Sequence, residues 1–317
     1  MEPAVEAVHV SKRYGSVVAV SDLTLAVRPG EVLGVLGPNG AGKTSAIRVL
    51  TTVLPPSGGS FTVAGFPNTR PAEIRRRIGV LPESAGYPER QQAQEYLRYH
   101  ARLYGHSRAG ARAVAASLLE EVGLADRARS LISTYSRGMR QRLGIARALV
   151  NDPSVVFLDE PTLGLDPAGQ RQVLAHVGRI ASERGAAVLL CTHLLAEVEE
   201  HCTRVLILNQ GRVLADGTVF EITRKAAAPR SGRLHVLAEH ADRAAAALRG
   251  SAAIERVEQL EGRPDWLSVV LAPSTNGDGP SLNAAIGILL AAEVPVLSFE
   301  LEGARLSDAF LAMTEAA

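Results

Sequence analysis

Short apolar runs separated by turn-forming residues dominate the first 81 positions of the chain. Runs of this length, rich in Val, Ile and Leu and bounded by Gly, Pro, Asn or Ser, predict β-strands. The predicted strands cover residues 5–10, 17–20, 23–27, 32–36, 61–64 and 78–81. We therefore expect the chain to begin with a β-rich region.

The spacing of apolar residues becomes helical from residue 91 to about residue 150. Leu118, Leu119 and Val122 repeat at helical intervals, and Gly123 is well placed to end their helix. Further along, apolar strands at 155–158, 187–191 and 205–208 alternate with two helical segments. This alternation is typical of an α/β fold in which helices cover a parallel sheet.

A change in composition near residue 224 separates a second region from the first. The segment 224–232 is predicted to be a linker. After it the pattern predicts β-α-β-β-α-β-α, at residues 234–238, 241–248, 254–260, 266–271, 282–292, 296–301 and 306–315. The first six elements follow the order of a ferredoxin-like α+β domain. We expect one domain at 1–223 and an accessory domain at 233–317.

The second region carries enough apolar residues for a core of its own. We expect its strand residues to share one sheet face that a helix covers. The strand residues expected on that face include Val257, Val269, Val270, Leu271, Val296 and Leu297.

Composition narrows the classes of function. The 317 residues allow about two domains. A formal net charge of +1 gives no overall field that would favour nucleic acid or anionic lipid. The two cysteines, Cys191 and Cys202, offer no disulfide framework and no metal-ligand spacing, so we expect two buried thiols.

No segment of the chain has the pattern of a signal peptide or of a membrane span. The N-terminal residues lack the charged-then-apolar layout of a signal peptide. The apolar run at 284–292 is about half the ~18 residues that a membrane-spanning helix needs. We expect a cytoplasmic chain without a membrane span of its own.

One glycine-rich loop carries the clearest chemistry. It matches the pattern G-x-x-x-x-G-K-[ST] and lies between the strand at 32–36 and a predicted helix: Gly37, Pro38, Asn39, Gly40, Ala41, Gly42, Lys43 and Thr44. Glycines allow backbone N–H groups to surround phosphates. Lys43 adds a positive charge at the outer phosphates, and the Thr44 hydroxyl is a ligand for Mg²⁺. We expect the loop and the adjacent Ser45 to bind a nucleoside triphosphate.

A pair of carboxylates follows the strand at 155–158. Asp159 fits a second Mg²⁺ contact at the end of a strand beside the phosphate-loop strand. Glu160 can orient or deprotonate the attacking water. An apolar run ending in Asp-Glu is often only a capped strand, but the phosphate loop upstream favours the catalytic interpretation.

The stretch 135–142, Tyr-Ser-Arg-Gly-Met-Arg-Gln-Arg, precedes a predicted helix at 143–150. It resembles the signature loop, usually Leu-Ser-Gly-Gly-Gln, of ABC transporter ATP-binding subunits, although Arg137 and Met139 depart from that wording. The resemblance covers residues 5 to about 223. It implies a P-loop NTPase core with an antiparallel β subdomain and a helical subdomain at about 91–150. It also implies that Ser136 and Gly138 contact a γ-phosphate, whereas by itself Ser136 is better suited to cap the helix.

Three more residues match the family in order. Tyr14 is similar to the aromatic residue that stacks on adenine, and His193 to the switch histidine at the γ-phosphate. Asp166 is similar to the loop residue that couples the two sites of a dimer. As isolated residues, Tyr14 would more often pack against protein and a histidine at a strand end would usually be incidental.

One position departs from the family pattern. Where the family has a glutamine after the strand at 78–81, this chain has Glu83, preceded by Pro82. A carboxylate can still hold Mg²⁺ or its water, but it adds negative charge beside the phosphates. Pro-Glu here and a tail like 224–317 are familiar in the drug- and antibiotic-exporter branch. The resemblance therefore implies the ATPase subunit of such an exporter.

The implied mechanism needs two copies of the chain. ATP bound by loop 37–44 of one copy would meet Ser136 and Gly138 of the other, and hydrolysis through Glu160 and His193, with Lys43 on the phosphates, would reopen the homodimer. A separate multi-span permease would carry the substrate, with this chain at the cytoplasmic face of the membrane.

Two other interpretations use the same phosphate loop. The first is a soluble ABC ATPase that acts on the ribosome or nucleic acid without transport. The single set of motifs, the lack of a heptad run and the balanced charge disfavour it. The second is a small-molecule kinase, which would leave the stretch 135–142 unexplained.

Overall fold

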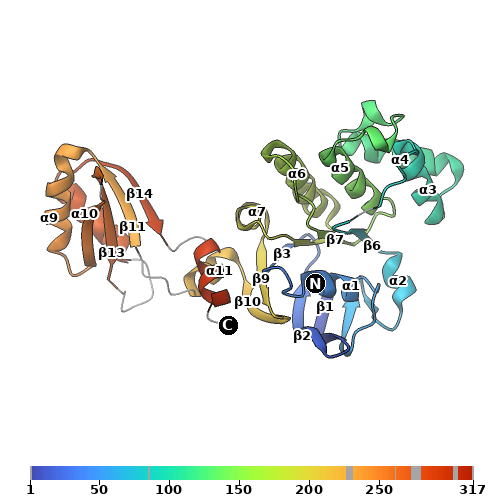
Figure 1. Cartoon of the computed structure of the whole chain (residues 1–317), viewed down its shortest axis with the longest axis horizontal. Coiled ribbons are helices and arrows are strands. Elements are labelled where there is room, and N and C mark those ends of the chain that lie inside the picture. Colours follow the sequence, from blue (N-terminus) through green and yellow to red (C-terminus); the bar gives the residue numbers. More distant parts are fainter. Residues whose placement is uncertain are drawn as a thin grey trace. The chain divides into compact units, whose positions relative to one another are not determined.

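The computed structural model describes residues 2–84, 86–225, 231–260, 262–272, 280–302 and 306–315. The chain divides into two compact units, Met1–Val219 and Phe220–Ala317. Each unit has a sheet and helices of its own (Figure 1). Within the described residues, no helix is both long enough and apolar enough to cross a membrane.

The first unit is built on a ten-stranded sheet in the order β5-β4-β1-β2-β10-β9-β3-β8-β7-β6. Neighbouring strands from β9 to β6 run parallel, as the alternation of strands and helices predicted. These strands are Arg204–Asn209 (β9), Val32–Leu36 (β3), Ala187–Cys191 (β8), Val155–Asp159 (β7) and Ile78–Leu81 (β6). Every residue of β3, β7 and β8 is buried, because helices cover both faces of this part of the sheet.

The rest of the sheet is largely antiparallel. Its strands are Val5–Tyr14 (β1), Val17–Val27 (β2), Gly58–Val63 (β4), Phe66–Pro67 (β5) and Arg212–Gly217 (β10). The prediction of separate strands at 17–20 and 23–27 is wrong. β2 continues through Ser21 and Asp22, and its residues from Val20 onward largely alternate between buried and more exposed positions. β10 was not predicted, because its residues of mixed polarity are only partly buried.

Helices pack against both faces of the parallel strands (Figure 1). Those of the first unit are Lys43–Leu50 (α1), Pro71–Arg75 (α2), Ala93–Leu103 (α3), Arg108–Glu121 (α4), Arg137–Ala148 (α5), Pro167–Arg184 (α6) and Leu195–His201 (α7). Alternate residues of β7 enter two separate cores. Val156 and Leu158 belong to the core with α3 to α6, and Val155 and Phe157 to the core with α1 and the antiparallel strands.

The helix predicted at 143–150 begins earlier, at Arg137. The Ser136 hydroxyl accepts a hydrogen bond from the Met139 N–H at 3.2 Å and caps the first turn. A serine at this position satisfies one of the free N–H groups that every helix start exposes. The predicted signature stretch is therefore largely the first turns of α5.

The second unit has a four-stranded antiparallel sheet in the order β12-β13-β11-β14. Its elements are Val219–Lys225 (α8), Ser231–Val236 (β11), Ala241–Arg249 (α9), Ile254–Leu260 (β12), Arg263–Leu271 (β13), Pro280–Ala291 (α10), Val296–Glu302 (β14) and Leu306–Glu315 (α11). Both ends of the predicted linker 224–232 lie inside elements, because α8 extends to Lys225 and β11 begins at Ser231. Residues 226–230 of that linker lie outside the described residues.

The prediction of one apolar sheet face in this unit is partly wrong. Val257, Val269 and Leu271 are buried in its core, with Ala285 and Leu289 of α10. Val270 is only half-buried, because successive residues of a strand point to opposite faces. Leu297 is 53% exposed.

Candidate functional site

The carboxyl ends of four neighbouring parallel strands lie next to one another in the first sheet. β3 is followed by the glycine-rich loop, β8 by Thr192 and His193, β7 by Glu160 and β6 by Glu83. The register aligns Asp159 with Cys191, and Cys191 with Val35. The expectation that the Asp159 strand lies beside the phosphate-loop strand is wrong, because β8 lies between them. Ligands of open α/β sheets bind at such carboxyl ends.

The glycine-rich loop is shaped by close backbone contacts. A Cβ atom at Gly37 would lie 2.4 Å from the Leu208 carbonyl oxygen, and one at Gly42 would lie 2.3 Å from that of Ala19. Gly42 also has φ 104°, which side chains rarely adopt. These two positions accept only glycine without rearrangement, so the loop can wrap closely around the start of α1.

Lys43 is folded back over this loop. Its ammonium donates to the carbonyl oxygens of Gly37 at 2.6 Å and Pro38 at 3.2 Å, and only 7% of the residue is exposed. From the sequence, Lys43 was expected only to place a positive charge at the outer phosphates. The structure shows a buried cation whose hydrogen bonds also hold the loop.

The loop forms one wall of a pocket of about 270 Å³. Most of its lining was predicted: Asn39, Gly40, Ala41, Gly42, Lys43, Thr44, Ser45, Glu83, Asp159 and Glu160. Ala19 of β2 also lines it and was missed, because an alanine in a strand gives no chemical signal. The described part of the lining thus combines the glycine-rich backbone with one cationic side chain and three carboxylates.

Asp159 is the most buried carboxylate of the pocket, at 3% exposure. Burial raises the pKa of its carboxyl group, and the charges of Glu83 and Glu160 raise it further. A hydrogen bond with the Thr44 hydroxyl and the Lys43 charge act in the opposite direction. Its Oδ1 atom has no hydrogen-bond partner among the described residues. A hydroxyl and a buried carboxylate oxygen left without a partner are a donor set that fits Mg²⁺.

Replacing Asp159 by Asn should separate stability from activity. A carboxyl group whose pKa rises on folding destabilises the fold at neutral pH, where it must be charged in the folded protein. This free-energy cost disappears as the pH falls towards the pKa of an unperturbed aspartate, about 3.9. Asp159→Asn should therefore raise the melting temperature of the nucleotide-free protein at pH 7. It should also abolish ATP hydrolysis. Thermal unfolding without nucleotide checks the first effect, and an unchanged or lower melting temperature would contradict this electrostatic account.

Glu160 and His193 contact each other directly. The His193 Nδ1 lies 2.8 Å from the Glu160 Oε2. Glu160 has a left-handed backbone, with φ 50°, and its N–H donates to the Cys191 carbonyl oxygen at 2.8 Å. A strained backbone at a pocket residue of this kind is common at functional sites. The structure therefore brings together Glu160 and His193, two of the three residues assigned to catalysis from the sequence, the third being Lys43.

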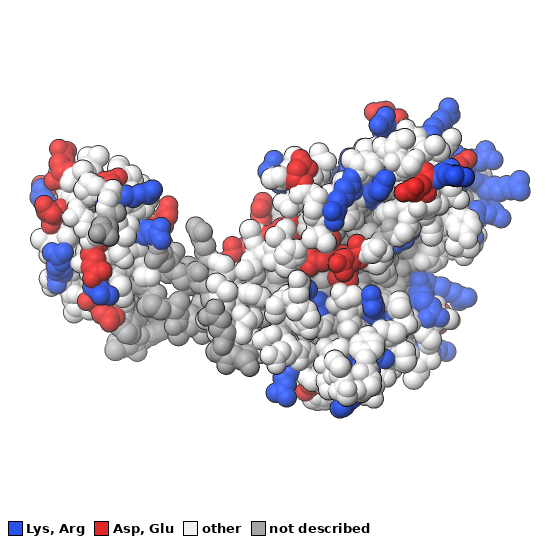
Figure 2. Space-filling view, viewed as in Figure 1, with Lys and Arg blue, Asp and Glu red and all other residues white. Residues whose placement is uncertain are grey.

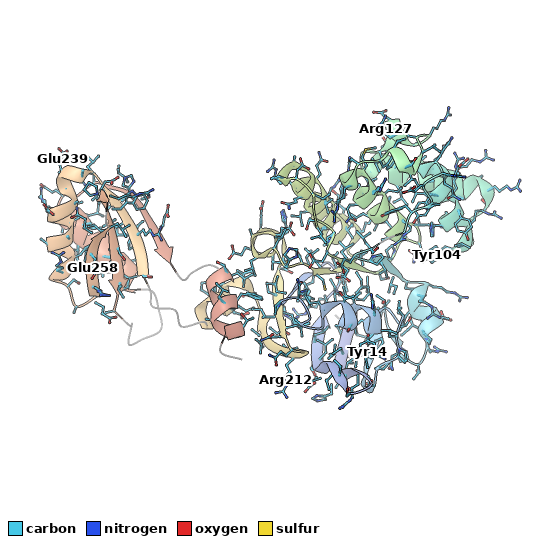
Figure 3. The ribbon with its side chains drawn as sticks, in the orientation of Figure 1. Tyr14, Tyr104, Arg127, Arg212, Glu239 and Glu258 are labelled. Carbon is cyan, nitrogen blue, oxygen red and sulfur yellow. The ribbon has the colours of Figure 1, made fainter. Side chains whose placement is uncertain are left out.

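Tyr14 ends β1 on the surface of the first unit, where it is 42% exposed (Figure 3). Its hydroxyl lies 3.5 Å from the Ser45 hydroxyl of α1. The Lys12 ammonium lies 5.3 Å from the ring centroid, within the range of a cation–π contact. An exposed aromatic ring beside the phosphate loop suits base stacking better than core packing.

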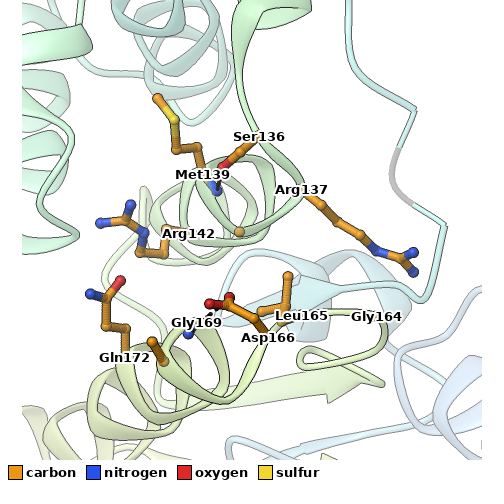
Figure 4. A pocket seen from close by; sticks show the side chains of 11 residues that line it. Ser136, Arg137, Met139, Arg142, Gly164, Leu165, Asp166, Gly169 and Gln172 are labelled. Atoms are coloured by element: carbon orange, nitrogen blue, oxygen red, sulfur yellow. Dashed lines mark hydrogen bonds between the residues drawn. The ribbon is translucent and has the colours of Figure 1, made fainter.

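Ser136, Gly138 and Asp166 lie in a different pocket, of about 350 Å³ (Figure 4). The Asp166 carboxylate caps α6 by accepting from the Gly169 N–H at 3.3 Å. The Arg137 guanidinium lies so close to Gly164 that a Cβ there would clash with it. Among the described residues, the linings of this pocket and of the phosphate-loop pocket have no member in common.

Comparisons with known proteins agree with this geometry. Residues 20–163 match the sequence profile of the ABC transporter family. The chain is 38% identical over 312 residues to the daunorubicin/doxorubicin resistance ATP-binding protein DrrA of Streptomyces peucetius. The aligned region covers 98% of this chain and 92% of that protein. It is 43% identical over 212 residues to the daunorubicin resistance ATP-binding protein DrrA3 of Streptomyces coeruleorubidus, 67% of each chain.

Solved structures share the fold over about two thirds of the chain. An ATP-binding subunit of an ABC transporter matches with a TM-score of 0.64 and 33% identity, over 70% of this chain and 92% of that one. A dimeric bacterial ABC transporter cassette shares the fold, with a TM-score of 0.62 and 23% identity over 68% and 98% of the two chains. The chain therefore belongs to the ABC transporter family, as one of its ATP-binding, ATP-hydrolysing subunits.

Proposed function

We propose that two copies of this chain enclose two ATP molecules and drive export through a separate membrane permease. The observation that carries the proposal is the division of the predicted site between two pockets. One pocket holds the phosphate loop and the carboxylates, and the other holds Ser136, Gly138 and Asp166. Two-fold pairing of chains can place the second pocket of one copy over the first pocket of the other.

Each group of the first pocket has a role in this proposal. Lys43 and the N–H groups of the loop bind the phosphates. Thr44 and Asp159, with Glu83 nearby, would hold Mg²⁺, which supplies positive charge to the phosphates when bound. Glu160 positions or deprotonates the attacking water, and His193 holds Glu160 and reaches the γ-phosphate.

The second pocket acts on the nucleotide of the partner copy. Ser136 and Gly138 offer a hydroxyl and bare backbone to its γ-phosphate, and Asp166 couples the two sites. Tyr14 stacks on adenine in its own chain. This division explains why hydrolysis would loosen the dimer, because the γ-phosphate is the group that both copies hold.

We propose that β11 to β14, with α9 and α10, form a ferredoxin-like accessory domain. Its β-α-β-β-α-β order and its strand order β12-β13-β11-β14 support this assignment. All predicted site residues come from positions 1–223. The domain would therefore tune dimer formation or hydrolysis without supplying catalytic groups.

The names of relatives support an exporter of a drug or antibiotic-like substrate. They include resistance proteins for daunorubicin and a linearmycin resistance ATP-binding protein of Bacillus subtilis. The chain would lie at the cytoplasmic face of the membrane, attached through its permease. In the view of Figure 2, Asp and Glu are interspersed with Lys and Arg in the second unit. Lys and Arg gather along one side of the first unit in the same view. The export and resistance names of the relatives do not favour the alternative of a soluble ATPase on nucleic acid.

Co-purification from detergent-solubilised membranes tests the partner. The tagged full chain, isolated from the cell that encodes it, should bring down a multi-span protein without ATP-binding motifs, and ATP hydrolysis should rise when that protein is added back. A chain ending at residue 223 serves as the comparison. A chain that stays free of membrane proteins and hydrolyses ATP equally well with ribosomes or DNA present would favour the alternative.

A further inference from the structure

A buried carboxylate outside the predicted site lies behind Glu160 and His193. Glu197 of α7 is 7% exposed. Its Oε2 accepts hydrogen bonds from the hydroxyls of Thr162 at 2.9 Å and Thr192 at 3.1 Å, and both threonines are fully buried. One oxygen atom therefore links the loop that follows Glu160 to the residue that precedes His193.

Further hydrogen bonds from backbone N–H groups hold Thr162 close to Glu160 and Thr192 close to His193. Leu163 N–H donates to the Glu160 carbonyl oxygen at 3.3 Å, so Thr162 lies within the turn that begins at Glu160. The Thr192 hydroxyl also accepts from the Leu194 N–H at 3.1 Å, which fixes the chain on the other side of His193. A shift of either threonine would therefore move a residue of the Glu160–His193 pair.

Helix α7 is itself held firmly against the sheet. A Cβ atom at Gly34 of β3 would lie 2.8 Å from Val198 Cγ1 and 2.9 Å from Cys202 Sγ. This close approach is possible only because residue 34 is glycine. Glu197, the neighbour of Val198, is thereby anchored to the strand that precedes the phosphate loop.

Burying the Glu197 carboxylate costs free energy of folding. Burial raises the pKa of the Glu197 carboxyl group, and the nearby charge of Glu160 also raises it. The Oε1 atom of Glu197 has no hydrogen-bond partner among the described residues. A buried charge with an oxygen atom left without a partner usually destabilises a fold relative to an apolar side chain. A role in the reaction gives a reason for keeping it.

We propose that Glu197 is a positioning residue that sets the contact between Glu160 and His193 by holding Thr162 and Thr192 together. The inference rests on the catalytic roles proposed for Glu160 and His193. Glu197 does not line the phosphate-loop pocket. Its loss should therefore lower turnover and spare ATP binding.

Steady-state kinetics of the full chain with MgATP test this role. Glu197→Ala should lower kcat about 10- to 100-fold, as small misplacements of catalytic groups do, while the Kd for ATP stays within about twofold of wild type. Glu197→Gln should restore kcat to within about threefold of wild type, because its amide oxygen can accept both threonine hydrogen bonds. Glu200→Gln, at an exposed position on the same helix, is the matched control and should leave kcat unchanged.

The double variant Thr162→Val/Thr192→Val leaves residue 197 unchanged and removes both hydrogen bonds to it, together with the one that Thr192 accepts from the Leu194 N–H. It provides the test if Glu197→Ala does not fold. It should lower kcat with ATP binding intact. Wild-type kcat in a folded Glu197→Ala protein or in the double variant would overturn the proposal. The kcat of Glu160→Gln is measured in parallel. A normal kcat in Glu160→Gln would refute the catalytic roles proposed for Glu160 and His193. A reduced kcat in Glu160→Gln together with a normal kcat in Glu197→Ala would refute only the positioning role of Glu197.

Discussion

Lys43→Ala should reduce ATP hydrolysis at least about 100-fold, the loss expected when one charged contact to a developing phosphate charge is removed. Lys43 is the one lysine among the described residues that line the pocket, and its ammonium already lies against the loop through Gly37 and Pro38. The substitution removes both the charge for the phosphates and the two hydrogen bonds that hold the loop. ATP affinity should fall as well, measured by titration with a fluorescent ATP analogue.

The fold should survive this change. The surrounding core consists of apolar residues of α1, β3 and their neighbours, which the variant keeps. Arg48→Ala, at an exposed position of the same helix, is the control and should hydrolyse ATP normally. A Lys43→Ala protein with wild-type hydrolysis would show that the phosphates bind elsewhere.

Glu160→Gln should lower kcat for ATP hydrolysis by about 10²–10⁴-fold, the usual contribution of a general base. The affinity for ATP should stay near its wild-type value. The amide keeps the shape of the side chain and its contact with His193, and Asp159 and Thr44 remain in place. Because the γ-phosphate is not removed, ATP should hold the variant as a dimer. Size-exclusion chromatography with and without ATP reports this directly.

Glu183→Gln, an exposed substitution on α6, controls for the change of charge. It should hydrolyse ATP at the wild-type rate and show no ATP-stabilised dimer. Undiminished hydrolysis by Glu160→Gln, with a monomer at every ATP concentration, would assign catalysis to another residue.

Local motifs were predictable from the sequence because their geometry is local. The phosphate loop, its flanking strand and helix, and the cap at Ser136 each depend on residues within about ten positions of one another. The role of His193 was assigned only through the family resemblance, and its contact with Glu160 was not predicted. In the structure this contact follows from the adjacency of β7 and β8, which brings their ends together.

Features set by distant packing were not predictable. The position of β8 between β3 and β7 depends on how helices cross over the sheet. Glu197 resembles its exposed neighbour Glu200 in the sequence, and only the packing of α7 against Gly34 buries one and exposes the other. Val269 and Val270 were expected on one sheet face because they belong to a continuous apolar run. Successive residues of β13 point to opposite faces, so only Val269 is buried in the core.

The shared site between two chains is the central claim, and Gly138 offers the most direct test. Among the described residues, a Cβ atom at Gly138 would meet only Leu165 Cδ2 at 3.8 Å, and one at Gly178 of α6 would meet nothing within 4 Å. Side chains at both positions therefore fit within a single chain. Only a side chain at Gly138 would enter the space that the partner's γ-phosphate is proposed to occupy.

The decisive measurement is sedimentation of Glu160→Gln with ATP, alone and combined with Gly138→Asp or with Gly178→Asp. We predict that Glu160→Gln and its combination with Gly178→Asp form ATP-dependent dimers, whereas the combination with Gly138→Asp stays monomeric with one ATP bound to each chain. If the Gly138→Asp combination forms dimers as tightly as the control, the pocket at Ser136 and Gly138 does not meet the nucleotide of a second chain.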